Sequence, residues 1–199
     1  MSRTAALLAI AAALAAPASV SAGDLHGHVR LALPGLTLPD VGPVVVYLES
    51  EALTSAPTTP PAVMRQQNAR FSPPFLAVAK GTDLAMPNDD AIYHNAFSFS
   101  SPNDFDLGLY PAGESRAVAL RHPGVVRIFC SIHEAMNGTV FVSPSPWFGI
   151  VDADGSYRIA GVPSGSFRVR TWAEKLPPIE KTLRVGGGEA TLDLVLGTP

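Results

Sequence analysis

The sequence predicts an all-β protein made of two β-sandwiches, one inserted into the other. Short runs of Val, Ile, Phe and Tyr are separated by Gly, Pro, Asn and Asp at intervals of about ten residues, a spacing typical of sandwiches and barrels. Helical periodicity of 3.6 residues is hard to find beyond the N-terminal segment. The 19 prolines and 17 glycines are spread among the apolar runs, so they indicate turns and strand edges.

The N-terminal segment, MSRTAALLAIAAALAAPASVSAGD, has one Arg ahead of an apolar run that ends in small residues. This pattern indicates a secretory signal peptide over residues 1–22, cleaved after about Ala22. No later segment approaches the roughly 20 continuous apolar residues that a membrane-spanning helix needs. We therefore expect a periplasmic or secreted protein without a membrane span.

The charge of the chain argues against one class of partner. The formal net charge is −3, and loss of the predicted signal peptide removes Arg3 alone among the charged residues, which makes the mature chain more acidic still. Proteins that bind nucleic acid usually carry a basic face. We therefore expect no nucleic-acid partner.

Two Pro-rich stretches, residues 54–62 and 143–147, divide the mature chain. Upstream of them only residues 25–33 and 43–50 read as strands, too few to bury a core alone. Downstream, residues 148–196 offer four or five strands. We predict that the flanks pair with each other into one discontinuous domain, residues 23–61 with 144–199, and that residues 62–143 form a second domain inserted into it.

The downstream flank contains a turn signal and a family resemblance. Asp154-Gly155 lies between two apolar runs and predicts a two-residue type I′ hairpin, because Gly tolerates positive φ. An EF-hand calcium loop starting at Asp152 is disfavoured, since its twelfth position is Pro163 and not Glu. The run from Asp152 to Val169 resembles carboxypeptidase regulatory-like (transthyretin-like) domains, which implies a small β-sandwich with a structural or adhesive role.

The stretch FCSIHEAMNG places the chain's one cysteine, Cys130, three residues before His133 and six before Met136. For a lone cysteine the simplest interpretation is a buried, inert thiol, but here an imidazole and a thioether lie in the same predicted turn. Mg²⁺ and Ca²⁺ prefer oxygen ligands, and zinc sites are built from Cys, His and carboxylates. Copper is the metal that suits this soft donor set.

Other cysteine chemistry fits less well. Covalent c-type haem attachment needs a second cysteine in C-x-x-C-H. A Cys-His nucleophile has no recognisable third orienting group or oxyanion hole in the sequence.

A trigonal copper site needs a second imidazole from elsewhere in the chain. His26 and His28 lie in the predicted flanking sandwich, and His122 lies in a turn where a solvent-facing position is expected. His94, in MPNDDAIYHNAFSFS, is the remaining candidate.

Taken together, four stretches of the chain resemble the cupredoxins, the blue-copper proteins. These stretches are PNDDAIYHNAFSFS, FDLGLYPAGES, GVVRIFC and C-x2-H-x2-M. The resemblance covers about residues 63–142; its methionine spacing is similar to that of the amicyanins, and with the flanking sandwich the chain is similar to secreted proteins of the methylamine-utilization type. It implies a Greek-key β-sandwich holding one type 1 copper ion. By position, His94, Cys130 and His133 form the equatorial plane and Met136 is the weak axial ligand.

The resemblance also implies roles around the site. Asn95 matches the residue whose hydrogen bonds connect the two ligand-bearing loops. Glu134 departs from the family, where Pro often follows the second histidine. A site closed by four protein ligands implies an electron carrier and not an enzyme. Its partner is expected to be a redox protein, such as a c-type cytochrome or a quinoprotein dehydrogenase, and electrons are expected to enter or leave through His133.

Three alternatives remain open at this point. The chain could deliver, store or sense copper without carrying electrons in turnover. The flanking sandwich could be the working part, in a structural or adhesive role, with copper as a stabiliser. Cleavage after Gly23 would leave His26 third from a free amine, an arrangement that binds Cu(II), although His26 more simply begins a strand.

Overall fold

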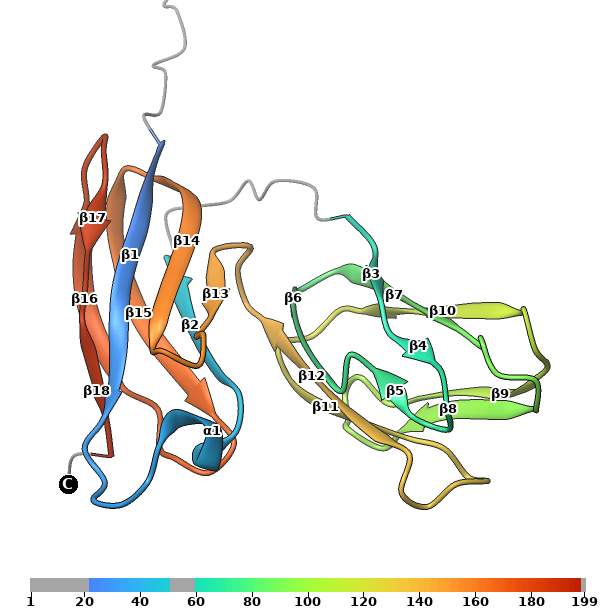
Figure 1. Ribbon diagram of the computed structural model, residues 1–199. Helices are drawn as coiled ribbons and strands as arrows, with labels where there is room; N and C mark the ends of the chain where they lie inside the picture. Colours follow the sequence, from blue (N-terminus) through green and yellow to red (C-terminus); the bar gives the residue numbers. More distant parts are fainter. Residues whose placement is uncertain (1–21, 51–59, 198–199) are drawn as a thin grey trace, which may run out of the picture.

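The computed structural model describes residues 22–50 and 60–197, and almost all of their regular structure is β-strand (Figure 1). The one helix in these ranges, α1 (Leu38–Val41), is a single turn. The predicted all-β class is therefore confirmed. The predicted signal peptide and most of the first Pro-rich stretch lie outside the described residues.

Strands β3 to β12 form what we call the central sandwich. Their bounds are β3 Ala62–Val63, β4 Arg65–Gln66, β5 Phe71–Ser72, β6 Phe75–Ala79, β7 Thr82–Pro87, β8 His94–Ser98, β9 Phe105–Tyr110, β10 Ser115–Leu120, β11 Gly124–Phe129 and β12 Asn137–Ser143. One sheet has the order β6-β12-β11-β8-β9, the other has the order β10-β7-β3, and β4 and β5 form a hairpin. This arrangement makes β8 and β11, the strands beside the predicted ligands, direct neighbours.

Alternating side chains of the two sheets fill the core of the central sandwich, as expected when one face of each strand is buried. Buried members of this core include Met64, Phe71, Leu84, Met86, Ala96, Leu120, Val126, Ile128, Val140 and Val142. Cys130 and Met136 belong to the same cluster. The predicted ligands thus lie at the end of a packed core.

The remaining strands form what we call the flanking sandwich. Their bounds are β1 Ala22–Leu31, β2 Val44–Glu49, β13 Phe148–Ile150, β14 Ser156–Pro163, β15 Gly165–Ala173, β16 Glu180–Val185, β17 Ala190–Thr191 and β18 Leu194–Leu196. β1 pairs with β14, β17 and β18, and the second sheet has the order β13-β2-β15-β16. The two upstream strands are where they were predicted, and the downstream flank has six strands, one more than the upper end of the prediction.

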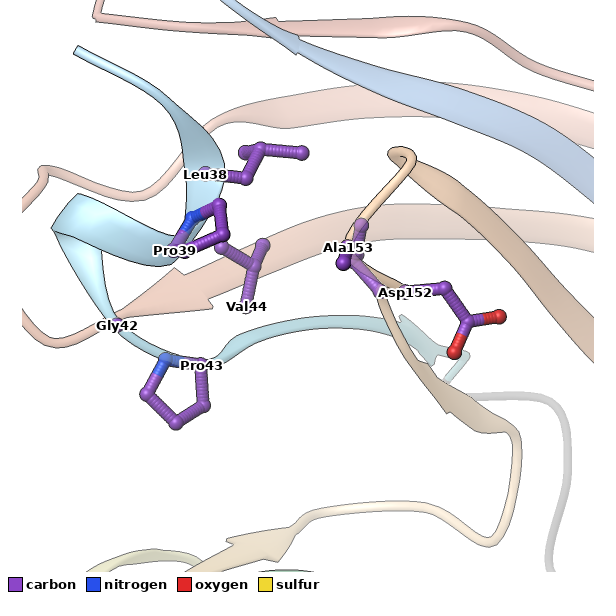
Figure 2. A pocket seen from close by; sticks show the side chains of 8 residues that line it. Leu38, Pro39, Gly42, Pro43, Val44, Asp152 and Ala153 are labelled. Carbon is purple, nitrogen blue, oxygen red and sulfur yellow. The ribbon is translucent and has the colours of Figure 1, made fainter.

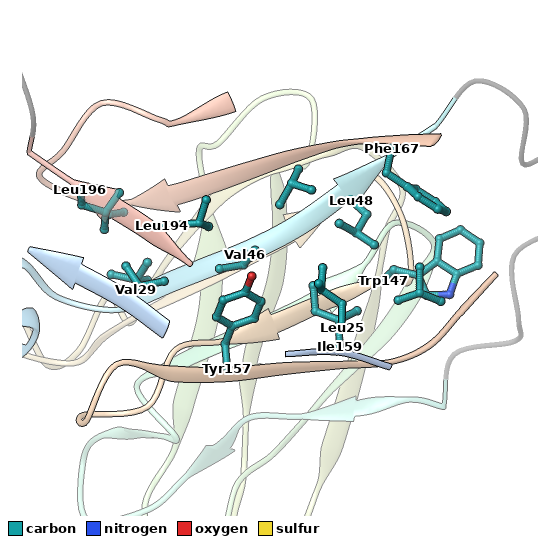
Figure 3. Close-up of a cluster of buried hydrophobic side chains, with 14 of the residues drawn as sticks. Leu25, Val29, Val46, Leu48, Trp147, Tyr157, Ile159, Phe167, Leu194 and Leu196 are labelled. Carbon is teal, nitrogen blue, oxygen red and sulfur yellow. The ribbon is translucent and has the colours of Figure 1, made fainter. Parts of the chain in front are cut away.

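The core of the flanking sandwich lies between its two sheets (Figure 3). Leu25 and Val29 of β1 meet Val46 and Leu48 of β2 from the opposite sheet, and all four side chains are buried. Tyr157, Phe167 and Leu194 of the downstream flank belong to the same cluster, so the upstream and downstream flanks share one core. Within the described residues, every strand pair joins two strands of the same sandwich; the exact domain boundaries stay a prediction.

The turn at Asp154-Gly155 differs from its prediction. Gly155 has a positive φ of 89°, but Asp154 does not have the positive φ that a type I′ turn requires. The Gly155 N–H donates to the Asp152 carbonyl, and the flanking strands pair in different sheets, β13 with β2 and β14 with β1. The turn carries the chain from one sheet to the other, so the predicted hairpin is wrong.

A small pocket of about 280 Å³ lies between this turn and α1 (Figure 2). Its lining is mainly apolar and includes Leu38, Pro39 and Val44. Figure 2 shows the carboxylate of Asp152 pointing away from Leu38 and Pro39. The pocket therefore presents little polar chemistry to a ligand.

An aromatic cluster joins the two sandwiches. The Trp172 ring of the flanking sandwich stacks on Phe75, with centroids 5.6 Å apart, and on Phe141, with centroids 5.1 Å apart. Tyr47 packs against Phe141 from the same side. Glu174, two residues after Trp172, accepts a hydrogen bond from Arg127 of the central sandwich at 2.6 Å. The contact covers part of the outer face of the five-stranded sheet and holds the two sandwiches side by side (Figure 1).

The described residues contain no helix that is both long and apolar enough to cross a membrane.

Candidate metal centre

Neighbouring strands bring the predicted ligands together. His94 is the first residue of β8, and Cys130 directly follows β11. The two strands are adjacent because Phe97 of β8 is paired with Phe129 of β11. His133 lies in the connection between β11 and β12, so three ligands come from one edge of the central sandwich.

The three nitrogen and sulfur donors form a compact group. The ligand atoms of His94, Cys130 and His133 all lie within 4.8 Å of one another. The His94 Nδ1 atom is 3.8 Å from the Cys130 Sγ atom, and the two imidazole rings have centroids 4.9 Å apart. Bonds of about 2.0–2.3 Å, typical of protein nitrogen and sulfur ligands, separate donors in a trigonal plane by about 3.5–4.0 Å. The spacing therefore suits a single metal ion.

The unpartnered donor of the group supports this fit. The Nδ1 atom of His133 is buried and has no hydrogen-bond partner. A buried polar atom without a partner costs free energy, so such atoms are rare unless they bind something that is not protein. A metal ion beside the Cys130 thiol would satisfy this nitrogen, and the soft donor set fits copper.

Three of the four predicted ligands are buried. His94, Cys130 and Met136 are 0%, 5% and 1% exposed, whereas His133 is partly exposed. Met136 also closes the loop, because Cys130 donates its N–H to the Met136 carbonyl at 3.2 Å and Met136 donates to the His133 carbonyl at 2.9 Å. Solvent therefore reaches the site through His133.

Asp90 orients His94, and sequence reasoning missed it. The Nε2 atom of His94 lies 2.8 Å from the Asp90 Oδ2 atom. A carboxylate accepts hydrogen bonds, so this contact places a proton on the Nε2 atom of His94 and leaves Nδ1 facing Cys130. The only sequence signal was an acidic residue four positions before a histidine in a loop, which is common without any such contact.

The same carboxylate holds a hairpin in place. Asn68 and Ala69, at the tip between β4 and β5, both have positive φ, and their N–H groups donate to Asp90 at 2.6 and 2.8 Å. Burial raises the pKa of Asp90, but the hydrogen bonds from Ala69, His94 and Asn68 outweigh burial and hold this pKa below its ordinary value. Asp90 therefore stays charged and keeps accepting at neutral pH.

Asn95 connects the two ligand-bearing segments. Its Oδ1 atom accepts the N–H of Ser131 at 2.7 Å and the Ser131 hydroxyl at 3.0 Å. Ser131 directly follows Cys130, so this contact restrains the backbone next to the thiol. A role for Asn95 beside a bound metal ion stays a prediction.

The other residues singled out from the sequence do not join the group. His122 and Glu134 are exposed, and His26 and His28 lie on β1 of the flanking sandwich. The direct contact between the Met136 sulfur and the other donors stays a prediction.

Comparison with known proteins gives a distant likeness. No family model and no curated protein matches the chain. Among solved structures, a purple cupredoxin from Nitrosopumilus maritimus is 24% identical over 41% of this chain and 99% of its own, with a TM-score of 0.37. A reduced amicyanin with one proline replaced by phenylalanine is 21% identical over 42% and 82%, with a TM-score of 0.38. An oxidised amicyanin with one proline replaced by alanine is 18% identical over 49% and 98%, with a TM-score of 0.39. Such low scores do not establish a family or a function.

Proposed function

We propose that this chain holds one type 1 copper ion and carries single electrons between exported redox proteins. The equatorial ligands are His94, Cys130 and His133, and Met136 is the weak axial ligand. The observation that carries the proposal is the group of His94, Cys130 and His133, whose ligand atoms lie within 4.8 Å of one another, together with the buried, unpartnered Nδ1 atom of His133.

Bound copper supplies a one-electron couple, which none of these side chains has alone. The protein contributes a fixed donor set. Asp90 holds the orientation of His94, and Asn95 restrains the segment that carries Cys130. Because strands and buried side chains fix these groups, little of the protein has to rearrange when an electron arrives or leaves.

Exposed apolar side chains close in sequence to His133 and Cys130 favour a protein partner. Ile132 and Phe129, the sequence neighbours of His133 and Cys130, are 49% and 37% exposed. Phe129 packs against Phe97, which in turn contacts the strongly exposed Phe99. Exposed apolar patches commonly mark interaction sites. We propose that a redox protein, such as a c-type cytochrome or a quinoprotein dehydrogenase, docks here, and that the exported location implied by residues 1–22 brings the two together.

The test is to load the mature protein with Cu(II) and record its visible and electron paramagnetic resonance spectra. We expect an intense thiolate-to-copper band and a narrow copper hyperfine splitting, and we expect Cys130→Ser to lose the band. His122→Ala, which changes an exposed histidine of the same sandwich, is the matched control and should keep it. A wild-type protein that stays colourless with Cu(II) bound or absent would refute the copper assignment.

A second measurement separates an electron carrier from a delivery protein. A carrier cycles reversibly between its oxidised and reduced forms and keeps its copper when a Cu(I) chelator competes. A delivery protein loses its copper to the chelator as soon as the ion has been reduced once to Cu(I). Rapid loss of the ion on reduction would overturn the electron-transfer proposal and leave the metal site intact.

A further inference from the structure

Strand β1 carries two histidines on the outer face of the flanking sandwich. Leu25, Gly27 and Val29 are buried, whereas His26 and His28 between them are partly or fully exposed. Alternate residues of a strand share a face, and a rise of about 3.3–3.4 Å per residue places the two histidine Cα atoms about 6.7 Å apart. Two imidazoles at this spacing can reach one metal ion.

The neighbouring strands leave room above these imidazoles. Ser156 of β14 is paired with His28, whereas His26 lies between Arg158 of β14 and Thr191 of β17. Ser156 and Thr191 are small and polar, and the Arg158 guanidinium donates to Asp24. A depression of about 390 Å³ results, lined by both histidines together with Asp152 and Arg158.

The charges around the depression suit a cation. The Oε1 atom of Glu189 is 3.9 Å from the His26 Nε2 atom, and the Asp193 Oδ1 atom accepts the His28 N–H at 2.9 Å. The one cationic side chain in the lining, Arg158, donates from Nε to Asp24 at 2.9 Å, so its charge is balanced.

Asp154 adds a further negative charge next to His28. Hydrogen bonds from the side chain and backbone of Ser156 hold the pKa of Asp154 below its ordinary value, and proximity to His28 lowers this pKa further. Carboxylates therefore lie beside both imidazoles.

We infer that His26 and His28 form a second, open site for a divalent transition-metal ion, with an oxygen of Glu189 and water as further ligands. Imidazole nitrogen with carboxylate oxygen suits Cu²⁺ and Zn²⁺, and the general order of affinities favours Cu²⁺. This inference does not depend on copper binding at Cys130.

Within the part of the chain that the structure describes, the group at Cys130 is the one set of three such donors already within 4.8 Å. The second site must therefore assemble by rotation of its side chains. The side chains of His26 and Glu189 are 38% and 86% exposed, so they have the space to rotate. An exposed site that keeps water ligands exchanges its ion with solvent, in contrast to the closed site proposed at Cys130.

The test counts copper in the mature protein by equilibrium dialysis against Cu(II). We expect the double variant His26→Ala, His28→Ala to bind one equivalent less than the wild type, while its thiolate-to-copper band stays unchanged. The matched control, His122→Ala, should bind as many equivalents as the wild type. Equal counts in the double variant and the wild type would overturn the inference.

A second measurement requires no substitution. Cu(II) added beyond the first equivalent should broaden the imidazole proton resonances of His26 and His28 in the wild-type protein and leave the His122 resonance sharp. Equal broadening of all three would show adventitious surface binding and would overturn the site. If the proposed site at Cys130 fails, the protein lacks the visible band, but the broadening at His26 and His28 is still expected.

Discussion

Replacing Asn95 with alanine removes the side chain that connects β8 to the segment after Cys130 in the candidate metal centre. Asn95 is 6% exposed, and its Oδ1 atom accepts two hydrogen bonds from Ser131, at 2.7 and 3.0 Å. The substitution leaves Cys130 and both histidines in place. It therefore tests the connection without removing a proposed ligand.

The expected loss of stability follows from these two bonds. A hydrogen bond contributes about 0.5–1.5 kcal/mol net, so two of them contribute about 2 kcal/mol. Ser131 is exposed, so water can replace part of what its N–H and hydroxyl lose. We expect Asn95→Ala to lower the free energy of unfolding of the copper-free protein by about 1–2 kcal/mol.

Urea unfolding followed by circular dichroism measures this change, and Ser131→Ala is the matched control. That variant loses the 3.0 Å bond and keeps the 2.7 Å bond from the backbone, so it should cost about half as much. Asn95→Ala should also shift the visible band of the copper-loaded protein, because the backbone beside Cys130 is released. If Asn95→Ala is no more destabilising than Ser131→Ala and leaves the spectrum unchanged, the connecting role is refuted.

The remaining predictions concern Trp172 and Gly27 of the flanking sandwich and Tyr110 of the central sandwich. Trp172→Ala removes the ring stacked on two phenylalanines and should lower the free energy of unfolding by about 2–4 kcal/mol in urea, somewhat less than the loss of a fully buried tryptophan. Trp172→Phe should lower it by less than about 1.5 kcal/mol. Equal effects of the two substitutions would contradict the stacking argument. Gly27→Ala would place a Cβ atom 1.9 Å from the Leu192 carbonyl oxygen and should cost about 3 kcal/mol or more, while Gly186→Ala, in open space, should be nearly neutral; a tolerated Gly27→Ala would show that β1 can move. Burial raises the pKa of Tyr110 to about 12, above the 10.0 of an exposed tyrosine, so the folded state keeps a proton that the unfolded chain loses. Stability should therefore fall by up to about 2–3 kcal/mol between these pH values in urea titrations, and Tyr110→Phe should show a smaller fall; an equal fall would contradict this assignment.

The sequence was most informative where the chemistry is local. Cys130, His133 and Met136 lie within seven residues on one connection, so any fold that makes β11 and β12 adjacent keeps them together. The all-β class was equally accessible, because short apolar runs separated by Gly, Pro, Asn and Asp show directly in the letters. His94 required the additional step of eliminating the other histidines.

Contacts between distant segments could not be predicted in the same way. Asp90 reaches back to the amides of Asn68 and Ala69, and nothing in those letters signals the positive φ that both residues adopt. Trp172 belongs to one sandwich and its phenylalanine partners belong to the other, so no local pattern signals their contact. The turn at Gly155 was mistaken for a hairpin because positive φ at one glycine is compatible with several turns, and the choice depends on which sheet each flanking strand joins.

Protein contacts alone hold most of the candidate metal centre. His94 is fully buried and bonded to Asp90, Asn95 is bonded to Ser131, and the Cys130 N–H is bonded within the loop. His133 differs, because it is partly exposed and its inner nitrogen has no partner. Any rearrangement on loss of a metal ion should therefore concentrate at His133. This residue also forms the contact of the site with solvent. One side chain would then control both the access of solvent to a bound ion and the retention of that ion.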